Sequence, residues 1–188
     1  MAFTALFDAC VIHPAPVRDL LLELAHREFF RAIWTEEIQR EWVESLLRRR
    51  PDLSRVRLAR TCELMNASVA DCLVTGYEHI IPALALPDQN DRHVLAAAIA
   101  GRADVIVTFN LKDFPADVLS AYGIEAQNPD EFLVHQFHLS PEAVCDAAKS
   151  IRERLRNPAR SVAEYLETLQ RVGLVRLVDE LQEIKEHL

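Results

Sequence analysis

The stretch that decides the fold is Leu86–Pro115, which reads LPDQNDRHVLAAAIAGRADVIVTFNLKDFP. Its turn-forming start, Pro87–Asp91, leads into the strong helix formers His93–Ala100, and Gly101 is expected to end that helix. The β-branched run Asp104–Thr108 that follows predicts a buried strand ending at a polar cluster. A helix followed at once by a buried strand is half of a βαβ crossover. This stretch therefore indicates a parallel sheet.

The flanking sequence extends the same alternation. The apolar run Phe3–Phe7 ends abruptly at Asp8, as a buried parallel strand would, and Phe30–Trp34 and Ile124–Ala126 are further short strands. Strands that alternate with helices predict an α/β fold in which helices flank a parallel sheet. Ligand sites in such folds lie at the carboxyl ends of the strands. Helices are expected over Val17–Phe29, from the N-cap Thr35 to Arg49, over Leu53–Ala67, from Pro115 to Tyr122, and from Pro129 onward.

The residue pattern of the sequence changes after His138. The segments Pro141–Arg156 and Ser161–His187 are helical and rich in charge, with Asn157-Pro158 between them and no strand pattern. We therefore expect a domain over residues 1–135 and an α-helical extension over 136–188. An apolar stripe in the extension could pack on the core, or could form a dimer or antitoxin interface. The stripe consists of Leu166, Leu169, Val172, Leu174, Leu177, Val178 and Leu181.

The composition limits the class of protein. The 188 residues are 50% hydrophobic, carry 21 Lys+Arg against 29 Asp+Glu, and have a formal charge of −8. No run approaches the ~18 apolar residues of a membrane span, and the start lacks the basic region of a signal peptide. The four scattered cysteines are typical of reduced thiols, so a soluble cytoplasmic protein is expected. The acidic balance argues against coating nucleic acid non-specifically, but it suits a Mg²⁺ site, because hard cations prefer carboxylate oxygens.

Three acidic residues stand at positions where the predicted fold could bring them together. Asp8 ends the first strand, Glu41 lies in the middle of a helix, and Asp91 begins the helix of the decisive stretch. Together they could hold one or two Mg²⁺ or Mn²⁺ ions, which activate water and neutralise phosphate charge. Taken singly, they read as a strand-end turn residue, a solvated surface charge and a helix cap. Spacing alone leaves both interpretations open.

Three blocks in this order, FTALFDACVI (residues 3–12), WTEEIQREW (34–42) and residues 86–115, resemble the PIN-domain nucleases. That group includes the VapC-type toxin ribonucleases, and the resemblance covers roughly residues 1–135. It implies a metal-dependent endoribonuclease that uses Mg²⁺ or Mn²⁺ to hydrolyse RNA phosphodiesters. It also implies a cognate antitoxin protein, because many bacterial members are held inactive by one encoded alongside.

Carried over position by position, the resemblance assigns the site to Asp8, Glu41, Asp91 and Asn110, with Asp113 nearby. The first three are then the metal ligands. Glu41 either completes the coordination or accepts a proton from water, and Asn110 or Asp113 orients from the far side. Asp8 and Asp91 are expected to bind the metal directly.

The sequence departs from the family pattern at two places. Cys10 stands where the family commonly has Asn, and Asn110 offers a neutral oxygen where an acid is usual. Asp113 or Asp88 could supply the missing charge. The rival interpretation is therefore a degenerate, non-catalytic module of the same fold, which binds protein or RNA through its surface and helical tail. A nuclease directed at DNA differs only in substrate.

Further residues allow both a functional and a purely structural interpretation. The hydroxyl of Thr108, at a strand end beside the site, could hold a metal-bound water, or Thr108 is simply a β-branched strand residue. Cations near the acidic positions could meet RNA phosphates, or they are solvated helix ends and exposed salt bridges. These cations are Arg48, Arg49, Arg50, Arg92 and Lys112.

Overall fold

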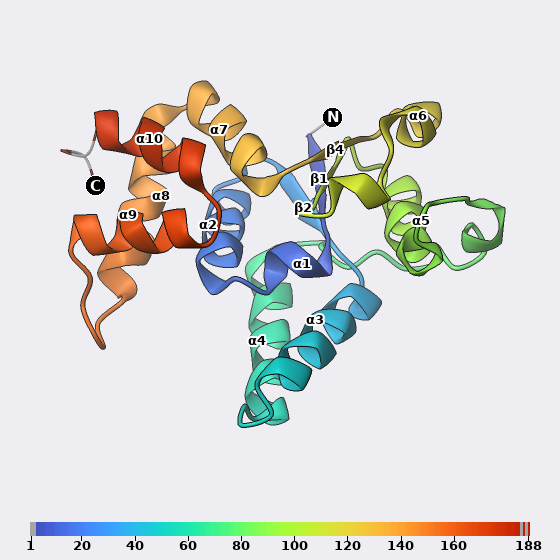
Figure 1. Cartoon of the computed structure of the whole chain (residues 1–188), viewed down its shortest axis with the longest axis horizontal. Helices are drawn as coiled ribbons and strands as arrows, with labels where there is room; N and C mark the ends of the chain where they lie inside the picture. The colour runs from blue at the N-terminus through green and yellow to red at the C-terminus, as the bar shows by residue number, and fades with distance from the viewer. Residues whose placement is uncertain (1–2, 185, 187) are drawn as a thin grey trace. The chain divides into compact units, whose positions relative to one another are not determined.

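A four-stranded parallel sheet joins segments from the N-terminal two thirds of the chain (Figure 1). The computed structural model describes residues 3–184, 186 and 188. The strands are β1 (Thr4–Phe7), β2 (Arg31–Ile33), β3 (Val105–Val107) and β4 (Glu125–Gln127). They pair in the order β2-β1-β3-β4, and every pairing is parallel. The predicted α/β fold with a parallel sheet is thus confirmed.

Helices precede and follow these strands, and they follow the predicted ones closely. Their bounds are α1 (Ala9–Ile12), α2 (Ala15–His26), α3 (Glu36–Arg49), α4 (Arg55–Ser68), α5 (Arg92–Gly101), α6 (Ala116–Leu119), α7 (Pro129–Leu139), α8 (Pro141–Arg154), α9 (Val162–Arg171) and α10 (Val175–Glu183). The short α1 has no counterpart among the predicted helices. The segment predicted over Ser161–His187 is broken at Gly173, whose φ is 96°, and residue 187 lies outside the described residues.

The chain divides into two compact units. The first contains Met1–His13 and Phe30–Asn128, and the second contains Pro14–Phe29 and Pro129–Leu188. Helix α2 therefore belongs to the second unit, where it contacts α8 and α9. The sequence suggested one boundary after residue 135, because apolar periodicity reveals that a helix has a buried face but not what covers it.

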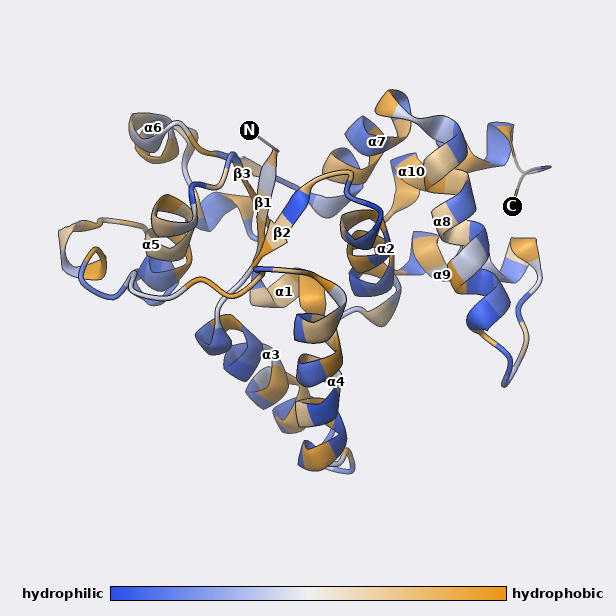
Figure 2. Ribbon diagram, turned by 180° about the vertical axis from the view of Figure 1, so that it is seen from behind, coloured by the Kyte–Doolittle hydropathy of each residue, from blue (hydrophilic) through white to orange (hydrophobic). Residues whose placement is uncertain are grey.

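The first unit buries the central strands of its sheet, whereas Arg31 in β2 and Glu125 in β4 are exposed. Leu6, Ile33 and Ile106 lie in register on neighbouring strands, and none of them is exposed to solvent. Phe7 stacks on Trp34 with ring centroids 6.1 Å apart. Along α3 and α4 the ribbon alternates between polar and apolar colouring, as in amphipathic helices (Figure 2). The sheet is therefore a rigid base for residues at the carboxyl ends of its strands.

Gly101 is the last residue of α5, but its role differs from that of a typical helix-ending glycine. A Cβ there would lie 2.4 Å from Ile33 Cδ1 and 3.0 Å from Val74 Cγ2. The left-handed conformation after the helix falls instead on Arg102, whose φ is 54°. Close packing of α5, rather than a turn, therefore explains the glycine.

The second unit is built from helices and has its own core. The apolar stripe of α9 and α10 is buried there, with Leu169, Leu177 and Leu181 at 0% exposure. The Asp130 carboxylate in α7 accepts hydrogen bonds from the backbone N–H groups of Arg176 and Leu177, each at 2.9 Å. The stripe therefore packs inside this unit. In the part of the chain that is described, no helix has both the length and the apolar character needed to cross a bilayer.

Candidate active site

Asp8 lies at the carboxyl end of β1, and its side chain is held by three donors. The backbone N–H of Ala9 donates to Oδ1 at 2.6 Å. The Thr108 hydroxyl and the Cys10 thiol both donate to Oδ2, at 2.7 and 3.1 Å. Asp8 is only 6% exposed. Its carboxylate is therefore oriented by the protein itself.

Cys10 is part of this arrangement rather than a packing residue alone. Besides donating to Asp8, its sulfur accepts a hydrogen bond from the backbone N–H of Phe109 at 3.2 Å. Burial first, and then the charge on Asp8, raise the pKa of the Cys10 thiol to about 12. The thiol consequently keeps its proton and remains a donor. In this structure it makes the carboxylate and loop hydrogen bonds for which an asparagine amide would be suited.

Thr108 joins the ends of β1 and β3. It is fully buried, and its hydroxyl donates to Asp8 while accepting from the backbone N–H of Asn110 at 3.0 Å. The main chain of Asn110 is thereby fixed next to the site, whereas its residue surface is exposed. The two hydrogen bonds give Thr108 a structural role in holding Asp8.

Asp91 lies at the start of α5 in a concentration of negative charge. Burial, and then the nearby carboxylates of Asp8, Asp88 and Asp113, raise the pKa of Asp91 to about 6. His93 opposes this shift but does not outweigh it. Carboxylates from three parts of the chain, at residues 8, 88–91 and 113, thus lie near enough for the other three to act on Asp91. A concentration of carboxylates of this kind favours a bound cation.

Glu41 is connected to this cluster through His93. The buried imidazole places Nε2 3.1 Å from Glu41 Oε1 and Nδ1 3.8 Å from Glu37 Oε2. Burial disfavours the charged ring, but Glu41, Glu37 and Asp8 outweigh it and raise the pKa of His93. The Tyr77 hydroxyl in turn donates to Glu37 Oε2 at 3.1 Å.

Sequence reasoning gave no role to Glu37 or Tyr77, and it treated Cys10 only as a departure from the family pattern. The sequence did contain a signal for Glu37, because it precedes Glu41 by one helical turn and therefore lies on the same helical face. His93, which both glutamates face, follows Asp91 by two residues. Among the described residues, no three His, Cys, Asp or Glu side chains are already gathered in a metal-coordinating arrangement. The metal-ligand roles of Asp8, Glu41 and Asp91 therefore stay predictions.

The predicted RNA-contacting cations fall into two groups. Arg92, whose Nε donates to the Gln89 carbonyl at 3.0 Å, and Lys112 are sequence neighbours of Asp91 and Asp113. The run Arg48–Arg50 lies at the α3–α4 connection, which both ribbon views place at the end of this hairpin remote from the sheet (Figures 1 and 2). There Arg50 makes two hydrogen bonds to Asp52, at 2.8 and 2.7 Å.

Comparison with known proteins agrees with this geometry. A family model described as the PIN domain matches residues 4–112, and the chain belongs to that family. A second model, described as the VapC50 C-terminal domain, matches residues 129–183.

Among curated proteins, the chain is 53% identical over 91 residues to a protein of Mycobacterium tuberculosis (strain ATCC 25618 / H37Rv) named "Putative ribonuclease VapC50". The alignment covers 46% of this chain and 53% of the relative, so the chain spans about half the length of the curated relative that it matches. No solved structure matches the chain.

Proposed function

We propose that the protein is a metal-dependent endoribonuclease that hydrolyses RNA phosphodiesters. The observation that carries this proposal is the group of carboxylates at the end of β1, where three donors orient Asp8, and where burial first and then Asp8, Asp88 and Asp113 raise the pKa of Asp91 to about 6. A divalent cation stabilises carboxylates that lie this close together. RNA as the substrate is supported by the ribonuclease activity in the relative's name.

The donor set fits Mg²⁺ or Mn²⁺ in both chemistry and charge. Asp8, Asp91 and Glu41 would hold the ion, with Asp113 and Asp88 adding negative charge nearby. A divalent ion bound there would acidify a water molecule and neutralise charge on the phosphate under attack. Asp8 is already fixed by its three donors, so its side chain loses little conformational entropy when it binds a metal.

The remaining residues would orient and move protons around this centre. Glu41, beside the imidazole of His93, would either complete the coordination of the ion or accept a proton from the attacking water. Asn110 or Asp113 would orient the substrate from the far side. Arg92 and Lys112 would offset the repulsion between the phosphate and a chain of formal charge −8.

The decisive experiment replaces Asp91 by Asn, which keeps the shape and removes the charge. RNA cleavage with Mn²⁺ should fall by roughly a thousandfold or more, because an incomplete site neither holds the ion nor positions water. Asp117→Asn, at an exposed position in α6, is the matched control and should cleave like the unmodified protein. Unchanged cleavage by the Asp91 variant would refute the assignment.

The family resemblance further suggests the toxin component of a toxin–antitoxin pair. Co-purification with the product of the adjacent gene would test this role, since an antitoxin should form a stable complex and abolish RNA cleavage. An adjacent protein that neither binds nor inhibits would count against it.

A second candidate is a non-catalytic module of the same fold. It is favoured by the absence of three gathered metal-ligating side chains among the described residues and by the neutral Asn110. Calorimetric titration with Mn²⁺ separates the two. If the unmodified protein releases or absorbs heat on binding Mn²⁺ and Asp8→Ala does not, the result supports the enzyme. If neither the unmodified protein nor the variant gives a heat of binding, the result supports the non-catalytic module.

A further inference from the structure

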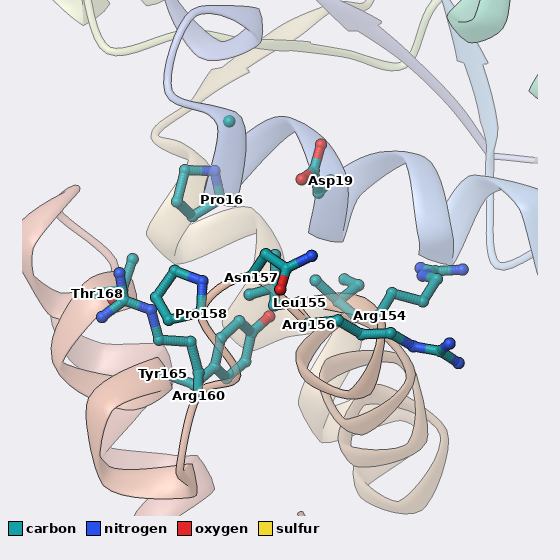
Figure 3. Close-up of a pocket in the computed structure, with 12 residues that line it drawn as sticks. Pro16, Asp19, Arg154, Leu155, Arg156, Asn157, Pro158, Arg160, Tyr165 and Thr168 are labelled. Carbon is teal, nitrogen blue, oxygen red and sulfur yellow. The ribbon is translucent and has the colours of Figure 1, made fainter.

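The second unit contains a pocket of about 520 Å³. Helices α2, α8 and α9 and the loop after α8 form its walls (Figure 3). All of its lining residues belong to the second unit, so it is distinct from the carboxylate cluster of the first. Pockets that hold small organic ligands are typically ~300–1,000 Å³, with mostly apolar walls and a few polar groups.

The strongest sign of a ligand is the side chain of Tyr165. It is only 2% exposed, yet its hydroxyl has no hydrogen-bond partner among the described residues. Figure 3 shows the hydroxyl end pointing into the space between α2 and the loop Leu155–Pro158. Burial first, and then the charge on Asp19, raise the pKa of Tyr165. The phenol thus remains a donor, and a ligand acceptor in the pocket would satisfy it.

The charge around the pocket indicates the sign of that ligand. Arg154, Arg156 and Arg160 all line it, although the chain as a whole is acidic. Arg154 is paired with Glu23, and the one carboxylate in the lining, that of Asp19, is paired with Arg18 at 3.0 Å. Within the described residues, Arg156 and Arg160 form no ion pair with a carboxylate. Figure 3 shows the guanidinium groups of Arg156 and Arg160 on opposite sides of the pocket, so each of them would attract an anion separately.

The apolar part of the lining fits a flat organic group. Pro16, Ile151, Leu155 and Pro158 offer hydrocarbon surface, and the Asn157 amide adds a donor and an acceptor. An inorganic anion would use the arginines but leave this surface and the Tyr165 hydroxyl unused. The pocket therefore fits a phosphate ester that carries a ring system.

We propose that this pocket binds a small phosphate monoester of nucleotide size, such as a nucleoside 5′-monophosphate. Arg160 binds the phosphate, the Tyr165 hydroxyl donates to an acceptor of the organic part, and the apolar wall covers its ring. The site is independent of the proposed nuclease activity, and its test does not use RNA cleavage.

The test is calorimetric titration of the full chain with 5′-AMP, 5′-CMP, adenosine and inorganic phosphate. A monophosphate should bind at least tenfold more tightly than either adenosine or phosphate, because only it uses both parts of the pocket. Tyr165→Phe should weaken binding about three- to tenfold, the value of one hydrogen bond. Arg160→Gln should weaken it about tenfold or more.

Arg171→Gln is the matched control, because Arg171 lies on α9 outside the lining and pairs with Glu167. It should bind like the unmodified protein. Chemical shifts of the Tyr165 ring should move when the monophosphate is added to the unmodified protein, and a cooperative melting transition shows that each weak-binding variant is folded. The proposal is overturned if no monophosphate binds, if phosphate alone binds equally well, or if Tyr165→Phe raises the melting temperature without affecting affinity.

Discussion

The side chain of Asp8 depends on donors from two strand ends. Ala9 and Cys10 follow β1 in the chain, whereas Thr108 follows β3, 100 residues from Asp8. Pairing of β1 with β3 is what brings the third donor within reach. The geometry of this carboxylate is thus coupled to the stability of the sheet.

Replacing Cys10 by Ala should lower the free energy of unfolding by about 1–3 kcal/mol, because the buried N–H of Phe109 loses its acceptor and Asp8 loses a donor. Urea denaturation measures this difference. Cys10→Ser retains a donor and an acceptor and should lose less than half as much. If the Ala and Ser variants are equally stable, the sulfur contributes only volume.

The raised pKa of Asp91 should appear in the pH dependence of stability without added metal. The pKa of Asp91 is about 6 in the folded protein against an ordinary value of 3.8, so between these values the folded state holds a proton that the unfolded state has lost. The contribution of Asp91 therefore makes stability fall as the pH rises from about 4 to about 6, and it is constant above that range. Melting temperatures of the unmodified protein and of Asp91→Asn should diverge across this window. Parallel curves would show that the pKa of Asp91 is not raised in the folded protein.

At the scale of single elements, local signals predicted what local contacts decide. Thr35 was expected to cap a helix, and its hydroxyl accepts from the N–H of Ile38 at 3.0 Å. The cap of α10 was not predictable, because Asp130 supplies it from 46 residues away. The same holds for the site. Asp8 and Asp91 could be inferred from their places beside predicted elements, whereas the contacts of Cys10 and His93 come from tertiary packing.

Removing this distant cap should destabilise the second unit. Asp130→Ala leaves the N–H groups of Arg176 and Leu177 without their carboxylate acceptor, so we expect a loss of about 1–3 kcal/mol in the free energy of unfolding. Thermal or urea unfolding followed by circular dichroism measures it. Asp179→Ala, at an exposed position in the capped helix α10, should lower the free energy of unfolding much less. Equal losses would mean that the cap adds nothing specific.

The end of α5 should respond in opposite directions to two substitutions. Gly101→Ala forces a Cβ against Ile33 and should cost about 1–3 kcal/mol of stability through overpacking. Arg102→Gly relieves a left-handed backbone position and should add about 1 kcal/mol. Urea midpoints of both variants test this. A stabilising Gly101→Ala would mean that Ile33 moves aside without cost.

At the scale of the whole molecule, sequence families and compact units divide the chain differently. The PIN domain match runs unbroken over residues 4–112, yet it contains Pro14–Phe29, which the structure groups with the C-terminal helices. The chain therefore passes between the units three times, after residues 13, 29 and 128. Each unit consists of two separate segments, so neither corresponds to a continuous fragment of the sequence.

A fragment of residues 1–128 should consequently be poorly folded, even though it contains the whole candidate active site. Its α2 buries Val17, Leu20 and Leu24 completely, and the contacts of α2 with α8 and α9 would be lost. Exposing one large apolar side chain to water costs about 1.5–3 kcal/mol of folding free energy. The cost of exposing three is therefore comparable to the whole free energy of unfolding of a typical domain, about 5–15 kcal/mol. We expect the fragment to bind a hydrophobic dye, to aggregate in size-exclusion chromatography and to lack cooperative melting. Co-expression with residues 129–188 should restore a soluble complex, because that piece supplies the missing partners of α2. A fragment 1–128 that stays monomeric and melts like the full chain would show that α2 needs no cover from the C-terminal helices.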